Sequence, residues 1–465
     1  MLNKIIITAA AVTVMAGCAT MAPDYQRPDM PVKDSWSGAK TEISADKKAS
    51  DIAWKDYFRS ENMQKVIQTA LDNNRDLRTA ALNIEKARAA YRIQKADLIP
   101  SVNLTAEGAR TAVPENASSS GSSVTSSSFS ANVNTSYEID FFGKVRSLNE
   151  AALRQYMATE EARTAAQMSL IAETANAYIT YLSDAKLLQI SKDTLKTRQD
   201  SYSLVKKGFD AGVRTELDLV QAVSAVEAAK ASIQQYTRAV ELDKNALTLL
   251  AGAEIDESLL KGDLDNVEFV KELPVGLPSD VLLNRPDVRQ SEQNLMAYNA
   301  NIGAARAAFF PSVSLTGYFG VASSELGNLF SSGSAFAWSF SPQINLPIFD
   351  AGRNKITLEN ANNNQKIAAA AYEKTIQTAF KEVMDGLSSK ATYGKQFDAQ
   401  KAQTAAAQRA YELSLLRYEK GVDSYLGVLD AQRSLFSAQQ ALISVRTADL
   451  SSRIALYKAL GGGQK

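Results

Sequence analysis

Two stretches of the chain alternate apolar and polar residues at every second position, and each stretch contains two such segments. The first pair covers about 101–112 and 128–140, and the second covers about 312–322 and 335–348. A period of two places neighbouring side chains on opposite faces of a sheet, so the pattern predicts two pairs of strands. Serine-rich segments separate the members of each pair, which is typical of exposed hairpin loops.

The segments after the strand pairs are rich in alanine, glutamine, lysine and glutamate and contain no proline. They predict a pair of long helices over about 144–250 and another over about 353–460, each with a glycine turn inside it. Beyond each turn, apolar residues are spaced alternately three and four apart, from Leu219 to Val240 and from Val428 to Val445. Such heptads are typical of coiled coils, although runs this short leave ordinary amphipathic helices as an alternative.

The second half of the chain repeats the first. Residues 76–105 and 287–316 are identical at ten of thirty positions when the sequence is shifted by 211. A second block, around Gly212 and Gly421, matches at a shift of 209. Two nearly equal shifts far apart in the chain indicate one duplicated unit of about 210 residues, so both halves should have the same architecture.

The chain begins with a targeting segment. Lys4 is followed by a short apolar run and by Met-Ala-Gly directly before Cys18, the only cysteine. The run is shorter than the ~20 apolar residues of a spanning helix and fits a secretory signal. Its end resembles a bacterial lipobox, which implies cleavage and lipidation of Cys18. A plain signal peptide with an incidental cysteine is the alternative. In lipoproteins of this kind, Ala19 in place of aspartate favours the outer membrane.

These features divide the chain into four parts. We expect a signal peptide at 1–17, a lipidated extended segment at 18–60, and two structural repeats at 61–270 and 271–465. Each repeat should contain a strand pair and a pair of long helices. No other apolar stretch is long enough for a spanning helix, so a membrane-spanning part would have to be made from the strands.

The composition excludes several classes of function. Lysine plus arginine equals aspartate plus glutamate, 51 each, so no basic surface for nucleic acid is expected. The chain has no histidine, which excludes histidine-based catalysis and histidine zinc sites, and a single cysteine excludes an intramolecular disulfide. No paired carboxylates or glycine-rich phosphate loop indicate catalysis. We therefore expect no enzyme, no catalytic or metal-binding residue, and no cofactor except the lipid on Cys18.

Four strands per chain cannot close a sheet in lipid, where open edges are not tolerated. Two chains would supply eight strands, whose inward side chains fill the interior, whereas three would supply twelve and leave a lumen. We therefore expect an α+β membrane protein with a trimeric twelve-stranded β-barrel, continued outside the membrane by a long α-helical coiled-coil barrel. The two repeats in each of three chains would give the helices pseudo-six-fold order.

Several motifs stand out along the mature chain, among them Ala70 to Leu77, Phe310-Pro311-Ser312 and five more. The five are Pro23-Asp24-Tyr25-Gln26-Arg27-Pro28, Trp54 to Phe58, Tyr137 to Lys144, Leu283 to Asp287, and Leu429 to Leu435. They resemble motifs of the TolC/OprM family of outer-membrane efflux factors, in its lipoprotein branch, and as a set they are specific. The resemblance implies a lipid-anchored homotrimer in the outer membrane that extends into the periplasm.

The same resemblance implies a function and partners. The chain would be the passive exit duct of a tripartite pump for drugs and other small toxic compounds. A periplasmic adaptor protein and an inner-membrane RND-type transporter would be its partners. Adaptor contacts are implied at Gly212, Val213, Gly421 and Val422, where glycine tolerates the positive φ of a tight turn.

The resemblance also implies a channel gate. Asp430 would form a ring of three carboxylates, which favours cations, and Tyr418 and Asp218 would make a contact between neighbouring helix pairs. Solvated helix faces are the alternative for both aspartates. The chain departs from TolC at Gly427, where TolC has a second acidic residue, and at Asp423, where TolC has a basic one. In these details it looks closer to OprM.

Two other functions stay open on the sequence. The same tube could be the outer-membrane channel of a type I protein secretion system, and neighbouring genes would discriminate between the two. A structural coiled-coil lipoprotein without a pore would give no conductance in a planar bilayer. The strongly alternating strands disfavour this last reading.

Overall fold

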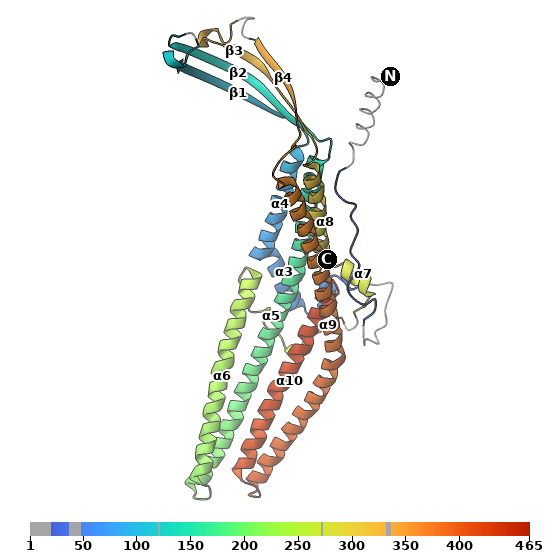
Figure 1. The fold of residues 1–465 in the computed structure, drawn as a ribbon. Helices are drawn as coiled ribbons and strands as arrows, with labels where there is room; N and C mark the ends of the chain where they lie inside the picture. Colours follow the sequence, from blue (N-terminus) through green and yellow to red (C-terminus); the bar gives the residue numbers. More distant parts are fainter. Residues whose placement is uncertain (1–19, 37–47, 120, 271–272, 332–335) are drawn as a thin grey trace. The chain divides into compact units, whose positions relative to one another are not determined.

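The computed structural model describes residues 20–36, 48–119, 121–270, 273–331 and 336–465, in two compact units (Figure 1). Unit 1 is formed by the described residues up to Asp29, Asn83–Glu160 and Gln290–Tyr372, and unit 2 by Met30–Leu82, Glu161–Arg289 and Glu373–Lys465. Four helices therefore contribute residues to both units. In the described part of the chain, no helix combines the length and the apolar character needed to cross a membrane.

The elements follow the duplicated order of the sequence. The α-helices are α2 (Trp54–Tyr57), α3 (Glu61–Asn73), α4 (Arg75–Ala96), α5 (Lys144–Asp210), α6 (Glu216–Ala251), α7 (Pro278–Leu283), α8 (Pro286–Ala307), α9 (Arg353–Glu419) and α10 (Tyr425–Ala459). The strands are β1 (Ser101–Val113), β2 (Val124–Ile139), β3 (Ser312–Ser323) and β4 (Phe336–Asn345). Short 3-10 turns lie at Ala49–Asp51, Glu115–Ala117, Leu264–Asn266 and Leu326–Asn328.

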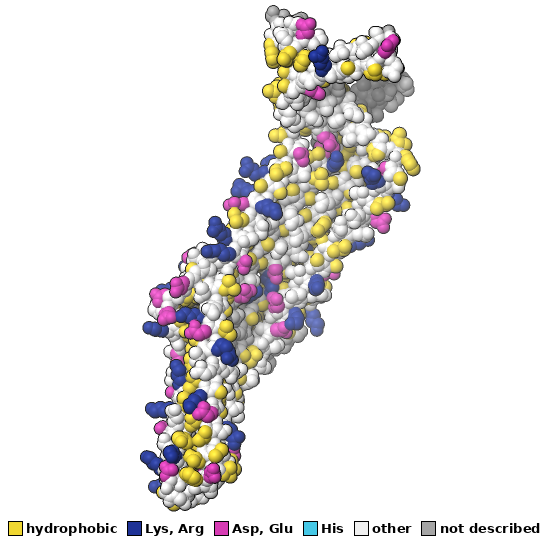
Figure 2. All heavy atoms as spheres, turned by 90° about the vertical axis from the view of Figure 1, so that its left-hand side faces the viewer, with side chains coloured by type: hydrophobic (Ala, Val, Ile, Leu, Met, Phe, Trp, Pro, Cys, Tyr) yellow, Lys and Arg dark blue, Asp and Glu magenta, His cyan; other side chains and the backbone are white. Residues whose placement is uncertain are grey.

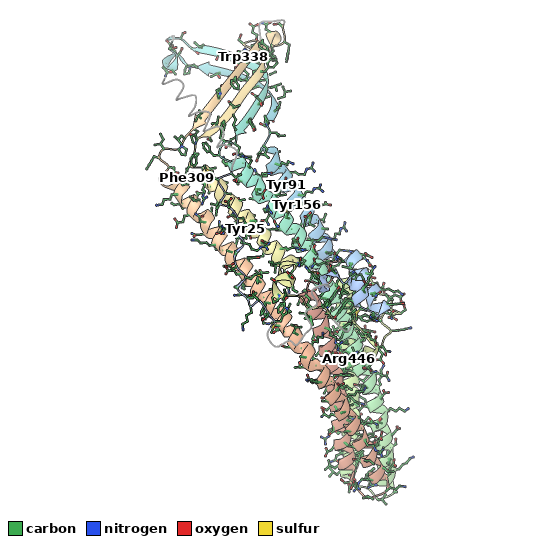
Figure 3. The ribbon with its side chains drawn as sticks, turned by 90° about the vertical axis from the view of Figure 1, so that its right-hand side faces the viewer. Tyr25, Tyr91, Tyr156, Phe309, Trp338 and Arg446 are labelled. Carbon is green, nitrogen blue, oxygen red and sulfur yellow. The ribbon has the colours of Figure 1, made fainter. Side chains whose placement is uncertain are left out.

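The four strands form one antiparallel sheet in unit 1, in the order β1-β2-β3-β4 (Figure 1). The two strand pairs are joined because β2 pairs with β3, with Tyr137 opposite Leu315. Alternation puts aromatic side chains on the surface of the sheet, such as Trp338, which is 67% exposed (Figure 3). Within the described chain the outer edges of β1 and β4 have no paired strand, so two rows of backbone groups lack partners.

The long helices after each strand pair begin with the same aspartate cap. The Asp140 carboxylate accepts hydrogen bonds from two backbone N–H groups at the start of α5, at 3.1 and 2.9 Å. Asp350 accepts two such bonds at the start of α9, at 2.9 and 2.8 Å. A negative group that binds free N–H groups also complements the helix dipole. Each cap therefore fixes the point where a strand turns into a helix.

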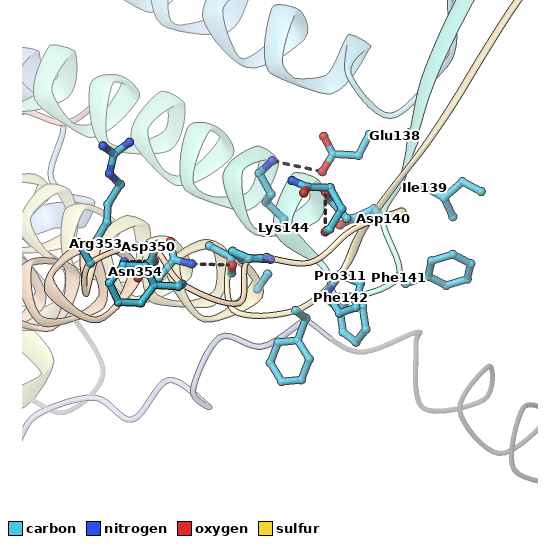
Figure 4. Close-up of a pocket in the computed structure, with 18 residues that line it drawn as sticks. Glu138, Ile139, Asp140, Phe141, Phe142, Lys144, Pro311, Asp350, Arg353 and Asn354 are labelled. Atoms are coloured by element: carbon cyan, nitrogen blue, oxygen red, sulfur yellow. Dashed lines mark hydrogen bonds and ion pairs between the residues drawn. The ribbon is translucent and has the colours of Figure 1, made fainter. Parts of the chain in front are cut away.

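Both caps line a cavity of about 660 Å³ where the strands and helices of unit 1 meet (Figure 4). Lys144 and Glu138 form an ion pair at 3.2 Å in its wall. Phe142 stacks on Phe310 with ring centroids 4.8 Å apart. The charged and aromatic side chains of the wall bind one another, so the cavity is part of the structural junction between strands and helices.

An N-terminal strap, residues 20–29, is fastened to α8 inside unit 1 (Figure 3). Arg27 makes two hydrogen bonds to the buried carboxylate of Glu292, at 2.6 and 3.0 Å, and the Tyr25 hydroxyl donates to the same carboxylate at 3.1 Å. At Gly303, a Cβ would lie only 2.6 Å from the strap backbone. The strap therefore depends on both a bidentate ion pair and a close approach that only glycine permits.

Aromatic stacking joins the two ends of unit 2. Tyr57 in α2 and Tyr457 in α10 stack with ring centroids 3.9 Å apart and an interplanar angle of 5°. The Tyr57 hydroxyl donates to the carbonyl of Arg453 at 2.8 Å, and the Tyr457 hydroxyl donates to that of Ile52 at 2.7 Å. Two large buried rings with satisfied hydroxyls therefore hold the first and last helices of unit 2 together.

Two helical hairpins, α5–α6 and α9–α10, continue unit 2 (Figure 1). The first helix of each hairpin has 67 residues, as the duplication requires. Small apolar side chains at the heptad positions are buried between the helices, including Ala222, Val226, Ala229 and Ala438. Small residues at such positions let two helix backbones approach closely.

Two carboxyl groups face each other between α5 and α6. Burial, together with the negative charge of Asp184, raises the pKa of Asp243 from an ordinary 3.8 to about 6. Burial also raises the pKa of Asp184. The folded state holds a proton on this pair that the unfolded state releases at lower pH. Folding stability therefore falls as the pH rises from about 4 to about 6.

We expect Asp243→Asn to raise the melting temperature of the detergent-solubilised protein by about 2 °C at pH 8 and to change it little at pH 4. The amide removes a carboxylate that is repelled by Asp184 above pH 6. The measurement is helix melting followed by far-UV circular dichroism. Asp200→Asn, at an exposed position of α5, is the matched control. An equal shift at both pH values would contradict the pairing.

Candidate functional site

The two hairpins end in turns with the same hydrogen bonds. In the first, the N–H of Val213 donates to the carbonyl five residues earlier at 2.9 Å, and that of Gly212 to the one three residues earlier at 2.8 Å. Val422 and Gly421 make the same two bonds at 2.9 and 3.0 Å. The glycines have φ of 75° and 73°, which is the left-handed conformation of a Schellman helix end.

The residues predicted to contact an adaptor form the exposed ends of these hairpins. Val213 is 72% exposed and Val422 is 62% exposed, although each directly follows a tight turn. Figure 2 shows hydrophobic side chains among charged ones on the surface of this end of unit 2. Exposed apolar residues at fixed turns are suited to contact with another protein.

Asp218 caps the start of α6. Its carboxylate accepts hydrogen bonds from the Thr215 backbone N–H at 3.2 Å and hydroxyl at 2.8 Å, and its own N–H donates to that hydroxyl at 3.2 Å. This is a complete capping box. The counterparts in the second hairpin are Ser424 and Gly427, and no side-chain cap forms there. In the single chain, the hydrogen bonds of Asp218 thus go to Thr215 and not to Tyr418.

Tyr418 packs between the two hairpins. It is 1% exposed, lies 5.4 Å from the Tyr425 ring, and its hydroxyl has no hydrogen-bond partner among the described residues. The Arg214 guanidinium of the first hairpin lies over its ring, 4.2 Å from the centroid. Burial raises the pKa of Tyr418, with Arg214 opposing the rise and Asp218 adding to it. A cation–π contact therefore connects the ends of the two hairpins.

Asp430, the predicted gate residue, lies on the surface of α10. It forms an ion pair with Arg433, one helical turn later. Both side chains are more than half exposed, so the pair contributes little to stability. A single chain places one Asp430 carboxylate in solvent, and a ring of such groups would require further copies of the chain.

Sequence reasoning missed Arg214. Its counterpart in the second half is Asp423, which pairs with Arg417 at 2.5 Å. The counterpart of Arg417 is Gly208, where a Cβ would lie 2.5 Å from Cγ of Arg214. Glycine thus leaves the space that lets Arg214 lie back over α5 and reach the second hairpin. The sequence signal that could have identified Arg214 is that it and Gly208 differ from their counterparts in the second half, Asp423 and Arg417.

Cys18, the predicted lipidation site, lies outside the described residues. The described part of the chain also shows no group of three or more acidic, histidine or cysteine side chains suited to a metal ion. The candidate site therefore consists of the two hairpin ends.

Comparison with known proteins gives the family. A family model described as outer membrane efflux protein matches residues 66–253 and 277–462. The two matches start 211 residues apart and end 209 residues apart, the same two shifts as the internal repeat. The chain belongs to the outer membrane efflux protein family.

Relatives and solved structures agree with this assignment. The chain is 47% identical over 466 residues to the antibiotic efflux pump outer membrane protein ArpC and to the toluene efflux pump outer membrane protein TtgC, both of Pseudomonas putida. These matches cover 99% of this chain and 96% of each relative. The open state of the MtrE outer membrane channel of Neisseria gonorrhoeae is 40% identical, with a TM-score of 0.87, over 96% of this chain and 99% of that chain.

The predicted family, α+β fold class and outer-membrane location are therefore confirmed. So is the general function, since this outer membrane efflux protein is the outer-membrane exit of an efflux system for toxic compounds. In the efflux protein, the two hairpin ends combine exposed apolar residues with a cation–π contact and two aspartates that are each already engaged. The hairpin ends therefore form a surface whose turns have a fixed conformation and whose exposed charge pairs are weak.

In the efflux protein, we expect Arg214→Gln to increase amide hydrogen exchange in both hairpin turns by about two- to fivefold. Loss of the guanidinium removes a cation–π contact worth about 0.5–1 kcal/mol at a partly exposed position. Mass spectrometry of the turn peptides measures the change. Tyr418→Phe keeps the ring and loses only a hydroxyl without a partner, so it should leave exchange unchanged. Equal effects of the two substitutions would contradict the cation–π contact.

Gly421→Ala should destabilise the second turn by about 1–2 kcal/mol, because its φ of 73° is costly for a residue with a Cβ. Gly427→Ala is the matched control in α10. No atom lies within 4 Å of its would-be Cβ, so this change should stabilise the helix by about 0.5–1 kcal/mol. Thermal melting and turn exchange should shift in opposite directions for the two variants. Shifts in the same direction would show that the turn glycine is not under conformational constraint.

Proposed function

We propose that three copies of this chain form a passive duct through the outer membrane. In this proposal a periplasmic adaptor protein connects the duct to an inner-membrane RND-type transporter, which supplies the energy. The chain itself catalyses no reaction. Its cargo is drugs and other small toxic compounds.

The four-stranded sheet is the observation that carries the proposal. Among the described residues its two outer edges have no paired strand, and its surface exposes Leu104, Phe340 and Ile344. In lipid, each unpaired backbone group costs several kcal/mol, so the edges must pair with strands of other copies. Three copies supply twelve strands, which enclose a lumen, whereas the eight strands of two copies would be filled by side chains.

The hairpin ends support the place of the adaptor and the gate. Gly212, Val213, Gly421 and Val422 form rigid exposed turns that a helical adaptor protein can contact. In a trimer, the three Asp430 carboxylates would form an acidic ring that favours cations. The capping carboxylate of Asp218 lies near enough to Tyr418 to affect its pKa, so a small shift between neighbouring hairpins would bring the two into contact.

The N-terminal strap supports lipid anchoring through Cys18. Thr20 lies against Gly143, where a Cβ would come within 2.7 Å of the Thr20 Cα. Gly143 lies between the end of β2 and the start of α5. Cys18 precedes Thr20 by two residues, a reach of about 7 Å. A lipid on Cys18 would therefore enter the membrane beside the sheet of unit 1.

The printed names of the relatives favour efflux of small molecules over type I protein secretion. ArpC is named for antibiotics and TtgC for toluene. Both relatives cover nearly the whole chain at 47% identity, which makes a related cargo class the best-supported one here. The two functions also differ in what a deletion strain accumulates.

Deletion of the gene should raise the accumulation of a fluorescent efflux dye to the level seen with a de-energised pump, and a plasmid copy should reverse the rise. The measurement is dye fluorescence per cell over time. A plasmid encoding Lys196→Met, a change at an exposed position of α5, is the matched control and should complement fully. Unchanged accumulation together with loss of one secreted protein from the medium would instead indicate type I secretion.

A further inference from the structure

Arg198 is a buried arginine without an acidic partner among the described residues. It lies in α5 and is only 8% exposed. Its Nη1 donates to the carbonyl of Ala225 in α6 at 2.8 Å, while Nε has no hydrogen-bond partner among the residues that the structure describes. No ion pair reaches Arg198 anywhere in the described part of the chain. The Phe436 ring, 5.9 Å away, is the only aromatic contact recorded for it among the described residues.

A guanidinium in this position is costly. Arginine keeps its charge in proteins, so it cannot escape the desolvation penalty by losing a proton. A buried charge is stable when a carboxylate or another anion pairs with it, and an unpaired one costs several kcal/mol. Burial lowers the pKa of Arg198, which reports the same penalty. The chain by itself therefore leaves an anion site unfilled at this point.

The guanidinium lines a cavity of about 450 Å³ between α6 and α10. The charged residues of its lining are Arg198 and Arg433, and its lining contains no acidic residue. Gln432, also in the lining, donates to Ser201 at 3.2 Å, and its buried Oε1 has no partner in the described chain. Apolar residues such as Leu426 and Val220 form the rest of the wall. The cavity combines an apolar rim with a positive floor, which suits a carboxylate on a short apolar stem.

In the described chain, none of the acidic residues near this cavity in the sequence forms an ion pair with Arg198. Asp430 pairs with Arg433, Glu227 pairs with Lys230, and Asp218 is held in the capping box of α6. Asp200, two residues after Arg198, is exposed on another face of α5. A carboxylate for Arg198 must therefore come from outside this hairpin pair. Only the first half of the duplication requires such a carboxylate, because the residue that aligns with Arg198 at the 209 shift is Ala407.

We infer that the cavity between α6 and α10 receives an aspartate or glutamate side chain from a helix of the partner protein that docks on these hairpins, with Arg198 as its ion-pair partner. The inference rests on the proposed function, because it takes the periplasmic adaptor as that partner. Charge complementarity sets the chemistry of the contact. The asymmetry of the duplication sets the number of such contacts: Arg198 occurs once per chain, and the residue that aligns with it in the second half, Ala407, is uncharged.

The first experiment tests the electrostatics on the purified detergent-solubilised protein. Ser224 lines the cavity and is exposed, so Ser224→Cys places a reactive thiol there. Its labelling rate is measured with a negatively charged sulfonate methanethiosulfonate and with a positively charged trimethylammonium one. We expect Arg198→Met to lower the negative-to-positive rate ratio about fivefold, as loss of one nearby charge implies in a watery cavity. Lys196→Met, two residues away on the exposed face of α5, should change the ratio much less.

The second experiment tests the partner in cells. Arg198→Met and Arg198→Glu should raise dye accumulation at least fivefold toward the deletion level, while the amount of assembled channel on a non-denaturing gel stays unchanged. Arg198→Lys should retain part of the function, because it keeps the charge and loses the fork geometry. Second-site suppressors of Arg198→Glu should replace an acidic residue of a second periplasmic protein by lysine or arginine.

The outcomes separate the alternatives. A negative-to-positive labelling ratio that stays the same after Arg198→Met overturns the inference. Wild-type efflux by Arg198→Glu in normally assembled channels also overturns it. Suppressors confined to acidic residues of this chain also overturn it, because they show that a second copy supplies the carboxylate. A wild-type chain that does not lower dye accumulation contradicts the proposed function instead. The labelling ratio then decides whether the cavity attracts anions at all.

Discussion

Backbone hydrogen bonding at the edges of one small sheet is the constraint on which the rest of this structure depends. Within the part of the chain that the structure describes, four antiparallel strands leave two edges unpaired, and lipid offers those edges no substitute for a hydrogen bond. The chain can complete the sheet only with copies of itself. Once the strands of several chains must close together, the helices that continue from the Asp140 and Asp350 caps are arranged around the same axis. Assembly is therefore a requirement of the secondary structure and not an addition to a finished monomer.

The duplication gives both halves of the chain the same backbone geometry, and the positions where the two halves differ carry the distinctive charged residues. Both hairpins keep the same turn hydrogen bonds and both long helices have 67 residues, because these features set the geometry. Several charged residues of the hairpins do not repeat. In the alignment of the two halves, Asp218 corresponds to Gly427 and Arg198 corresponds to Ala407. In a tube built from six similar hairpins, alternate hairpins therefore carry different charges. These charged residues repeat three times around the axis, although the backbones repeat six times.

Local signals explain what could be predicted from the sequence. The strands have a period of two, the long helices lack proline, and Gly212 and Gly421 mark turns that need positive φ, so each feature is encoded within a few residues. The contacts of Arg198, Arg214 and Glu292 could not be predicted in this way. Arg214 reaches a residue 204 positions away, and Glu292 binds the strap from 265 positions away. Such contacts depend on how whole hairpins pack, which no local pattern records.

The strap also sets an order on biogenesis. Its ion pair joins Arg27 to Glu292, so the strap has no docking surface until α8 has been made. A growing chain emerges at about 5–20 residues per second, so the N-terminus waits for tens of seconds without its partner helix. During that interval the strap belongs to a chain that has neither its second strand pair nor its second hairpin. The contact between the strap and α8 therefore forms late, after synthesis has reached the second repeat.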